Sequence, residues 1–177
     1  MVVGELSAQT ADAVVRPVRS DLAPVTPASR HLEQRAGEKF GADLAKAGPL
    51  PLGGAVITPS GELPASFVIH VVVMSEDEPQ TALSVQRALG NGLRRAVDLG
   101  LDSLALPALG LGVGTTEPEV SARTLVEILF NHLDEGSAPL DLTIVAASEF
   151  EAELFRRLVD DPARNRDPSR PESSDAE

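Results

Sequence analysis

Two kinds of apolar pattern alternate along the chain: continuous runs, and stripes that recur every three or four residues. Continuous runs bounded by turn residues are typical of buried strands, and the run at 67–74 is interrupted only by His70. A strand that is apolar on both faces is typical of the centre of a parallel sheet. The runs predict strands at residues 13–15, 55–58, 67–74, 103–106 and 142–147.

Periodic stripes between these runs predict helices. Thr26 is placed to cap a first helix, with Pro27 in its first turn and Gly48 at its end. Its buried stripe consists of Leu32, Ala36, Phe40 and Leu44. Later helices are expected over about 80–99, after the capping-box pair Thr116 and Glu119, and after the pair Ser148 and Glu151. The alternation predicts an α/β fold, a three-layer α/β/α sandwich with a mixed, largely parallel central sheet.

Composition and charge narrow the classes of function. The 177 residues suffice for one domain, and the formal charge of −12 argues against duplex DNA as a partner, which needs a basic surface. There is no cysteine and the three histidines lack metal-ligand spacing, so we expect neither a metal site nor a cofactor. No secretory signal or membrane-length apolar run is visible, which predicts a cytoplasmic protein without a membrane partner. Residues 161–177 are expected to be a disordered acidic, Pro- and Ser-rich tail.

The strongest chemical signal is a glycine-punctuated loop after the strand at 103–106. Gly110, Gly112 and Gly114 let the backbone turn tightly and approach a ligand, and the helix that follows adds free N–H groups and a positive dipole end. Such a loop binds an anion without a lysine, so an acidic protein can still hold a diphosphate. A Walker loop would need Gly-Lys followed by Ser or Thr, which is absent. The alternative is a turn that merely packs helix against sheet.

Several segments, in order, resemble the macrodomain family, the ADP-ribose-binding fold. They are Gly4-Glu5-Leu6-Ser7, Ala11-Asp12-Ala13-Val14-Val15, Gly54 to Pro64, Phe67 to Val71, and Leu106 to Gly114. The resemblance covers about residues 2–159 and implies a macrodomain-like module over residues 1–160. It implies that Glu5 contacts the adenine amino group and that the segment 106–114 wraps the diphosphate and distal ribose.

The resemblance implies that the chain binds ADP-ribose or a related, more highly phosphorylated nucleotide, free or on a modified protein. The implied ligand contacts are Glu5, Leu6, Arg19, Ser20, Val25, Thr26, Pro107, Gly110, Leu111, Gly112, Val113, Gly114, Thr115 and Phe150. Two alternatives stay open: an ADP-ribosyl hydrolase or deacetylase with a non-standard active site, and a scaffold that has lost ligand binding. No residue is singled out as catalytic, and binding is favoured over catalysis. The sequence says nothing about the oligomeric state.

The departures from the family pattern lie in the first loop. Arg16-Pro17-Val18-Arg19 stands where the family has Asn-Ala-Ala-Asn, so Arg19 replaces the asparagine that orients the distal ribose. Pro24-Val25-Thr26-Pro27 replaces the family's glycine run, and proline cannot supply the same N–H donors. Ser29 falls where hydrolytic relatives often carry an aspartate.

A cluster of basic residues follows from these departures. It consists of Arg16, Arg19, Arg30 and Arg35, with His31 among them. One interpretation is a site adapted to a more anionic ligand, with Arg19 as its main contributor, since guanidinium suits phosphate and carboxylate. The other is that the arginines pair with Glu33, Glu38 or Asp21 on a solvated face, with Arg30 and Arg35 pointing outward.

Three further side chains allow two interpretations each. Phe150 follows the last strand and could stack on the adenine, but its spacing to Leu154 and Leu158 favours a place in the core. We expect His70 to be a hydrogen-bonded core residue rather than a catalytic one. His132, near a helix end, is expected to meet the negative end of the helix dipole.

Overall fold

The computed structural model describes residues 1–111 and 117–160. The elements, in chain order, are β1 (Val2–Val3), the short helix η1 (Leu6–Ala8), β2 (Ala13–Arg19), α1 (Pro27–Ala36), α2 (Glu38–Ala47), β3 (Ala55–Pro59), β4 (Phe67–Met74), α3 (Ala82–Asp98), β5 (Ser103–Pro107), α4 (Pro118–Asp134), β6 (Asp141–Ala146) and α5 (Glu149–Val159). The predicted cap at Thr116 and the predicted tail lie outside the described residues.

The strands form one six-stranded sheet in the order β1-β6-β5-β2-β4-β3. Neighbouring strands are parallel except β3 and β4, which are antiparallel. The mixed, largely parallel sheet predicted from the sequence is therefore confirmed. β1 was not predicted, because two valines give no periodic signal.

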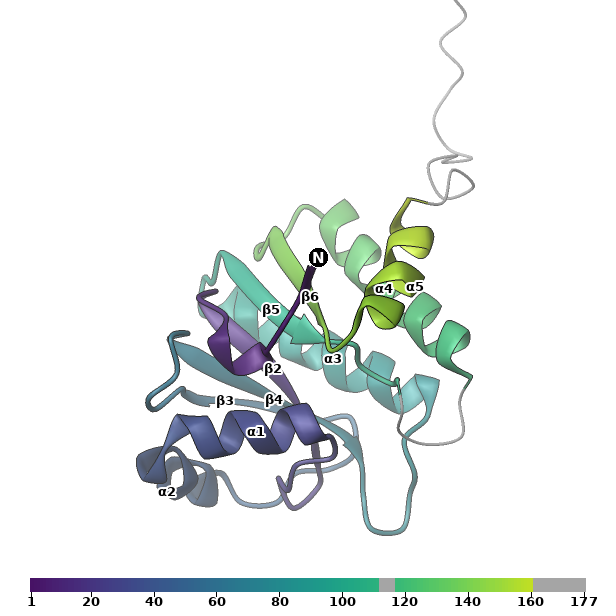
Figure 1. Ribbon diagram of the computed structural model, residues 1–177. Coiled ribbons are helices and arrows are strands. Elements are labelled where there is room, and N and C mark those ends of the chain that lie inside the picture. The colour runs from purple at the N-terminus through teal and green to yellow at the C-terminus, as the bar shows by residue number, and fades with distance from the viewer. Residues whose placement is uncertain (112–116, 161–177) are drawn as a thin grey trace, which may run out of the picture.

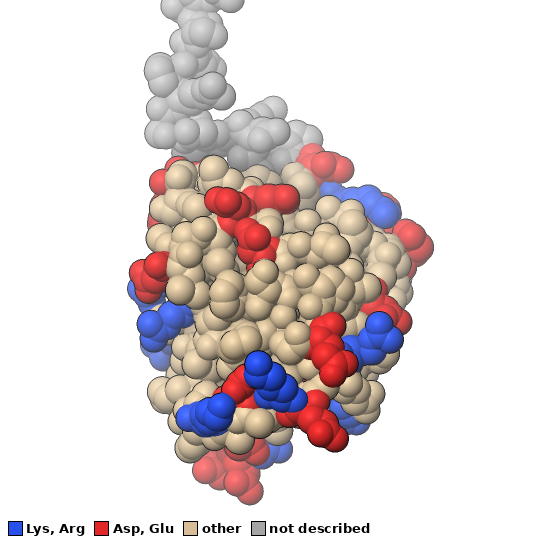
Figure 2. Space-filling model, turned by 90° about the vertical axis from the view of Figure 1, so that its left-hand side faces the viewer, with Lys and Arg blue, Asp and Glu red and all other residues tan. Residues whose placement is uncertain are grey.

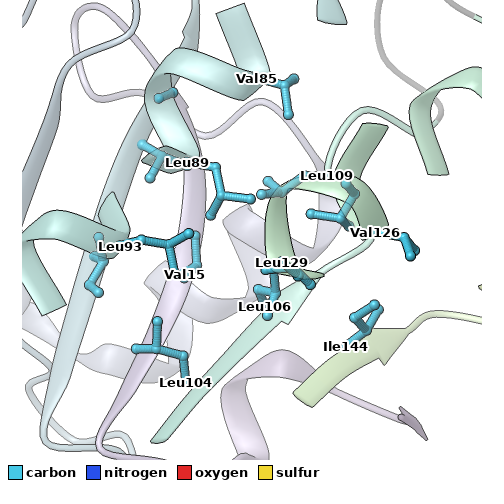
Figure 3. Close-up of a cluster of buried hydrophobic side chains, with 14 of the residues drawn as sticks. Val15, Val85, Leu89, Leu93, Leu104, Leu106, Leu109, Val126, Leu129 and Ile144 are labelled. Atoms are coloured by element: carbon cyan, nitrogen blue, oxygen red, sulfur yellow. The ribbon is translucent and has the colours of Figure 1, made fainter. Parts of the chain in front are cut away.

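Helices cover both faces of this sheet, which gives the predicted three layers. Figure 1 shows α1 and α2 in front of the sheet and α3 behind it. On the far face, buried side chains of α3, α4 and the strands form what we call the α3/α4 cluster, and Figure 3 shows many of them converging. The α1/α2 cluster on the other face includes Leu32, Phe40, Val14 and Val72. α5 packs against α4 and the outer strands β6 and β1.

The single helix predicted to run from Thr26 to Gly48 is wrong, because the chain breaks into α1 and α2 at Gly37. Gly37 has φ 81°, a left-handed conformation that ends one helix and lets the next begin in a new direction. The predicted apolar stripe is nevertheless buried on both sides of the break. The spacing therefore identified the correct face but not the glycine break.

β2 is longer than predicted, since it continues through Pro17 to Arg19. A proline cannot donate to a sheet ladder, so it is tolerated where one side of a strand is unpaired. β2 pairs with β4 along its length but with β5 only at Ala13 and Val14, which leaves the β5 side free near Pro17. The end of the strand therefore separates from β5 and carries Arg19 into the first loop.

Charged side chains are scattered over the end of the molecule at which the parallel strands begin. Figure 2 views it from the left of Figure 1, where the parallel strands begin, and shows acidic and basic side chains interspersed around a broad uncharged area. None of the helices in residues 1–111 and 117–160 has the length and apolar character needed to cross a membrane.

Candidate functional site

The parallel strands bring four predicted segments to one edge of the sheet. Val3 of β1 lies beside Ala146 of β6, and Val145 lies beside Pro107 of β5, so these strands end together. The segments that follow β1, β2, β5 and β6 therefore leave the sheet at the carboxyl ends of these strands. α1 and α5 begin at the same edge and direct their free N–H groups toward it.

The first loop, which follows β2, is folded tightly on itself. The Arg19 amide donates to the Ala23 carbonyl at 2.9 Å, and the Leu22 amide donates to the Arg19 carbonyl at 2.8 Å. A bridge joins Val18 to Pro24, and Leu22 has φ 68°, which is unusual for a side chain larger than glycine. The loop is thus stabilised by hydrogen bonds among its own residues.

Two of the ligand contacts predicted in this loop are used within the fold. The Ser20 amide donates to the Met74 carbonyl at 3.0 Å, and the Ser20 carbonyl accepts from the Leu50 amide at 2.8 Å. The Thr26 hydroxyl accepts from the Ser29 amide at 3.1 Å and so caps α1 as predicted. For Ser20 and for the half-buried Val25, contact with a ligand stays a prediction.

Arg19 stands at the mouth of this loop with 38% of its side chain exposed. Its Nε lies 3.6 Å from the Asp21 carboxylate, an ion pair that is too long for a hydrogen bond. That nitrogen is buried and has no hydrogen-bond partner among residues 1–111 and 117–160. The predicted ion pair between Arg19 and Asp21 is thus present, but it does not give the Arg19 Nε–H an acceptor.

Arg16, the other arginine of this segment, is wholly buried and paired. Its guanidinium forms an ion pair with Glu33 and lies beside the ring of His70, with Nη1 3.2 Å from the His70 Nδ1. Arginine has no acceptor, so Nδ1 must accept and His70 must carry its proton on Nε2, which donates to Thr58 Oγ1 at 2.9 Å. For Arg16 the pairing interpretation was therefore right, although the arginine itself is buried and only its partner Glu33 reaches the solvated face.

The pKa values of this network follow from burial. Burial and the neighbouring positive charge of Arg16 lower the pKa of His70 to about 3, so the ring is neutral near pH 7. Burial also lowers the pKa of Arg16, which the negative charge of Glu33 partly offsets. The predicted core role of His70 fits this environment. His132 is buried in the last turn of α4 and its Nε2 lies 3.0 Å from the Pro139 carbonyl.

The segment after β1 presents one exposed carboxylate and one unpaired hydroxyl. Glu5 lies 3.4 Å from His31 of α1, and both side chains are largely exposed. The side chain of Leu6 is buried in the α1/α2 cluster, so only its main chain could reach a ligand. Ser7 Oγ is buried without a hydrogen-bond partner in the described part of the chain.

The second loop begins at Pro107 and packs closely at its start. Gly110 has φ 91°, and a Cβ there would lie 3.1 Å from Ser121 Cβ, so both conformation and space favour glycine. The Leu111 amide donates to the Ala108 carbonyl at 3.2 Å. The predicted contacts at Gly112, Val113, Gly114 and Thr115 lie outside the described residues, so the anion-binding role of this loop stays a prediction.

Phe150 is not a core residue, contrary to the interpretation that its spacing favoured. It is 72% exposed, in the first turn of α5 and directly after β6. The buried face of α5 is formed instead by Ala152, Phe155 and Leu158, which turns Phe150 outward. The predicted cap of this helix is confirmed, because Ser148 Oγ accepts from the Glu151 amide. A large aromatic side chain thus lies free at the carboxyl edge.

Comparisons with known proteins identify the family. The family model described as Macro domain matches residues 15–125. A protein of Aeropyrum pernix is 37% identical over 113 residues, which are 63% of this chain and 60% of that protein. A protein of Enterobacter sp. named O-acetyl-ADP-ribose deacetylase is 30% identical over 165 residues, which are 90% of this chain and 92% of that protein.

The solved macrodomain of Oceanobacillus iheyensis with ADP shares the fold. It has a TM-score of 0.80 at 19% identity and covers 92% of this chain, while this chain covers 90% of it. The sheet order and the layers described above fit that likeness. The chain belongs to the macrodomain family.

Proposed function

We propose that this protein binds ADP-ribose or a related nucleotide at the carboxyl edge of its sheet. The observation that carries the proposal is that the two buried side-chain atoms left without a hydrogen bond in the described residues, Ser7 Oγ and Arg19 Nε, belong to segments that meet at this edge. An unsatisfied buried polar atom costs free energy, so a polar ligand that pairs with it is stabilised.

The exposed side chains at this edge match the chemistry of such a ligand. The Glu5 carboxylate can accept from an adenine amino group, and the Phe150 ring is free to stack on a base. Arg19 adds a permanent positive charge beside the phosphates or distal ribose, which favours a ligand more phosphorylated than ADP-ribose. We expect the loop at residues 110–115 to bind the diphosphate of the ligand.

The relatives support the proposal. The Oceanobacillus iheyensis macrodomain has been solved with ADP and, as a mutant, with ADPR. In this chain the ligand is free ADP-ribose or the same group attached to a modified protein, since the site lies at the surface.

Calorimetric titration of the full chain with ADP-ribose tests the proposal. Phe150→Ala removes the stacking surface and should weaken binding about fivefold, whereas Leu140→Ala, which removes an exposed leucine 58% accessible before β6, should not. Arg19→Gln should weaken a ligand with an additional phosphate more than ADP-ribose itself, with Arg157→Gln as the control for lost charge. Absence of binding at millimolar ADP-ribose would reject the proposal.

A deacetylase activity is the second candidate, and the name of the Enterobacter relatives favours it. It requires a group that activates water. Asp21, a carboxylate within the first loop, is exposed and paired with Arg19. Release of acetate from O-acetyl-ADP-ribose that disappears in Asp21→Asn would establish the activity, and binding without turnover would leave a binding module. Neither binding nor turnover would favour the scaffold.

A further inference from the structure

Arg16 is the largest fully buried side chain of the described residues, and its contacts reach beyond the sheet. Nη1 donates to the Leu22 carbonyl at 3.2 Å, and Nε donates to the Ser29 carbonyl at 3.4 Å. The Glu33 carboxylate neutralises it, and its guanidinium carbon lies 5.9 Å from the centre of the Phe40 ring. One side chain in β2 thus contacts the first loop, α1 and α2.

Arg16 forms hydrogen bonds to residues whose backbone conformation depends on their surroundings. Leu22 has a positive φ, which a residue with a β-carbon adopts only when its surroundings enforce it. Ser29 and Glu33 belong to α1, whose first turn lies directly after the loop. The Ser29 hydroxyl also donates to the Pro17 carbonyl at 3.0 Å, which fixes the same turn to β2 from a second point.

We propose that Arg16 is a positioning residue for the ligand site. With Glu33 as its counterion, it holds the first loop, residues 19–26, in a single conformation before any ligand arrives. This inference rests on the proposed function, because it assigns a role in binding to a side chain that touches no ligand. It also separates the two arginines of the segment: Arg19 faces the ligand, and Arg16 holds the loop that carries it.

The expected consequence is a site that does not close on its ligand. A loop that is ordered beforehand loses little conformational entropy on binding, so the cost of ordering it is not subtracted from affinity. Pro24 and Pro27 restrict the same segment further. Loosening the Arg16 contact should therefore weaken binding, chiefly through faster dissociation.

The test uses Glu33→Gln and Arg16→Lys in the full chain. The first leaves the guanidinium without its counterion, and the second keeps the charge but removes the planar fork. Glu38→Gln is the matched control, since it removes one carboxylate from the neighbouring helix and that carboxylate has no ion pair in the described residues. The readouts are amide hydrogen exchange at Arg19 and Leu22 without ligand, and the affinity and dissociation rate of ADP-ribose.

We expect faster exchange at both amides and an affinity about tenfold weaker in Glu33→Gln, with neither change in Glu38→Gln. Leu158→Ala, which destabilises the protein from the opposite cluster, controls for general loss of stability and should leave affinity unchanged where the protein is folded. Unchanged exchange in Glu33→Gln, or an equal loss of affinity in Leu158→Ala, would overturn the inference. If Arg16→Lys does not fold, the results for Glu33→Gln alone test the positioning role of Arg16.

The proposed function can fail separately from this inference. If the parent chain binds no ADP-ribose while Glu33→Gln still accelerates exchange, Arg16 holds the loop but positions nothing for this ligand, and the binding role is rejected. If the parent chain binds ADP-ribose and the variants bind it equally well, the proposed function is supported and the positioning role of Arg16 is rejected.

Discussion

The two faces of the central sheet are stabilised by different chemistry. The α3/α4 cluster is built from aliphatic side chains with Phe155, as the labelled residues of Figure 3 illustrate. The α1/α2 cluster also encloses a charged and polar network of Arg16, His70 and Thr58, with Glu33 at its rim. The face with the polar network is the one that carries the first loop of the candidate site.

This difference shows what a buried charge contributes. Apolar packing is non-directional, and many arrangements of similar volume satisfy it. A buried guanidinium must be paired and hydrogen-bonded, so it specifies where its partners lie. The α3/α4 cluster therefore supplies much of the hydrophobic burial, while the network on the other face determines the path of the loop that leaves β2.

The largest expected effect comes from truncating the buried charge. Arg16→Ala should lower the free energy of unfolding by about 3–5 kcal/mol, because it removes the partner of Glu33 and the donor to the Leu22 carbonyl. Arg16→Met, which keeps much of the volume, should recover less than half of this loss. Urea unfolding of both variants measures the difference. Full recovery in Arg16→Met would show that volume, not polarity, matters at this position.

The polar network also makes stability depend on pH. The pKa of His70 is about 3 in the folded state and about 6.5 in the unfolded chain, so the unfolded state takes up a proton first as the pH falls. The stabilisation that His70 contributes by staying neutral in the folded state is present above about pH 6.5 and is lost progressively as the pH falls toward 3. Between pH 7 and pH 4.5 the loss should be about 3 kcal/mol.

His70→Gln is the control for this titration. It cannot take up the proton, so its free energy of unfolding should fall less steeply between pH 7 and pH 4.5 than that of the parent, while the carboxylates contribute equally to both. Parallel pH profiles for the two proteins would contradict the neutral, buried state of His70.

Two glycines of α3 give a matched pair for the α3/α4 side of the sheet. A Cβ at Gly92 would lie 2.9 Å from Val71 Cγ1, whereas nothing lies within 4 Å of a Cβ at Gly90. Gly92→Ala should cost about 1–3 kcal/mol through overpacking, despite the better helix propensity of alanine. Gly90→Ala should stabilise by about 0.5–1 kcal/mol. Thermal unfolding of both variants checks the sign of each change in stability. An unchanged stability in Gly92→Ala would indicate that α3 packs less closely against Val71 than described.

The smallest effect is expected at an exposed ion pair. Arg123 lies 3.4 Å from Glu119 on the surface of α4, with half of its side chain exposed. Arg123→Gln should change the free energy of unfolding by about 0.5 kcal/mol or less, because solvent screens the pair. A change as large as that in Arg16→Ala would remove the distinction between buried and exposed arginines on which the comparison of the two faces rests.

Local patterns predicted most of the fold but fewer details of the site. The five longer strands and the cap at Ser148 followed from apolar runs and capping residues. The burial of Arg16 could have been inferred, because it alternates in β2 with Val14 and Val18, which face α1 and α2. The core position favoured for Phe150 was wrong, because its spacing to Leu154 and Leu158 fits a buried face and only the packing of Phe155 turns it outward.

The order of apolar runs and stripes is a property of the sequence alone, because a strand or helix must bury its apolar side whatever surrounds it. It determined the layered α/β architecture and the carboxyl edge at which the loops meet. Which polar side chains turn inward was decided by tertiary structure. A charge is buried only where partners distant in sequence are supplied to it, as Glu33 and His70 are to Arg16, and no local pattern contains those distances.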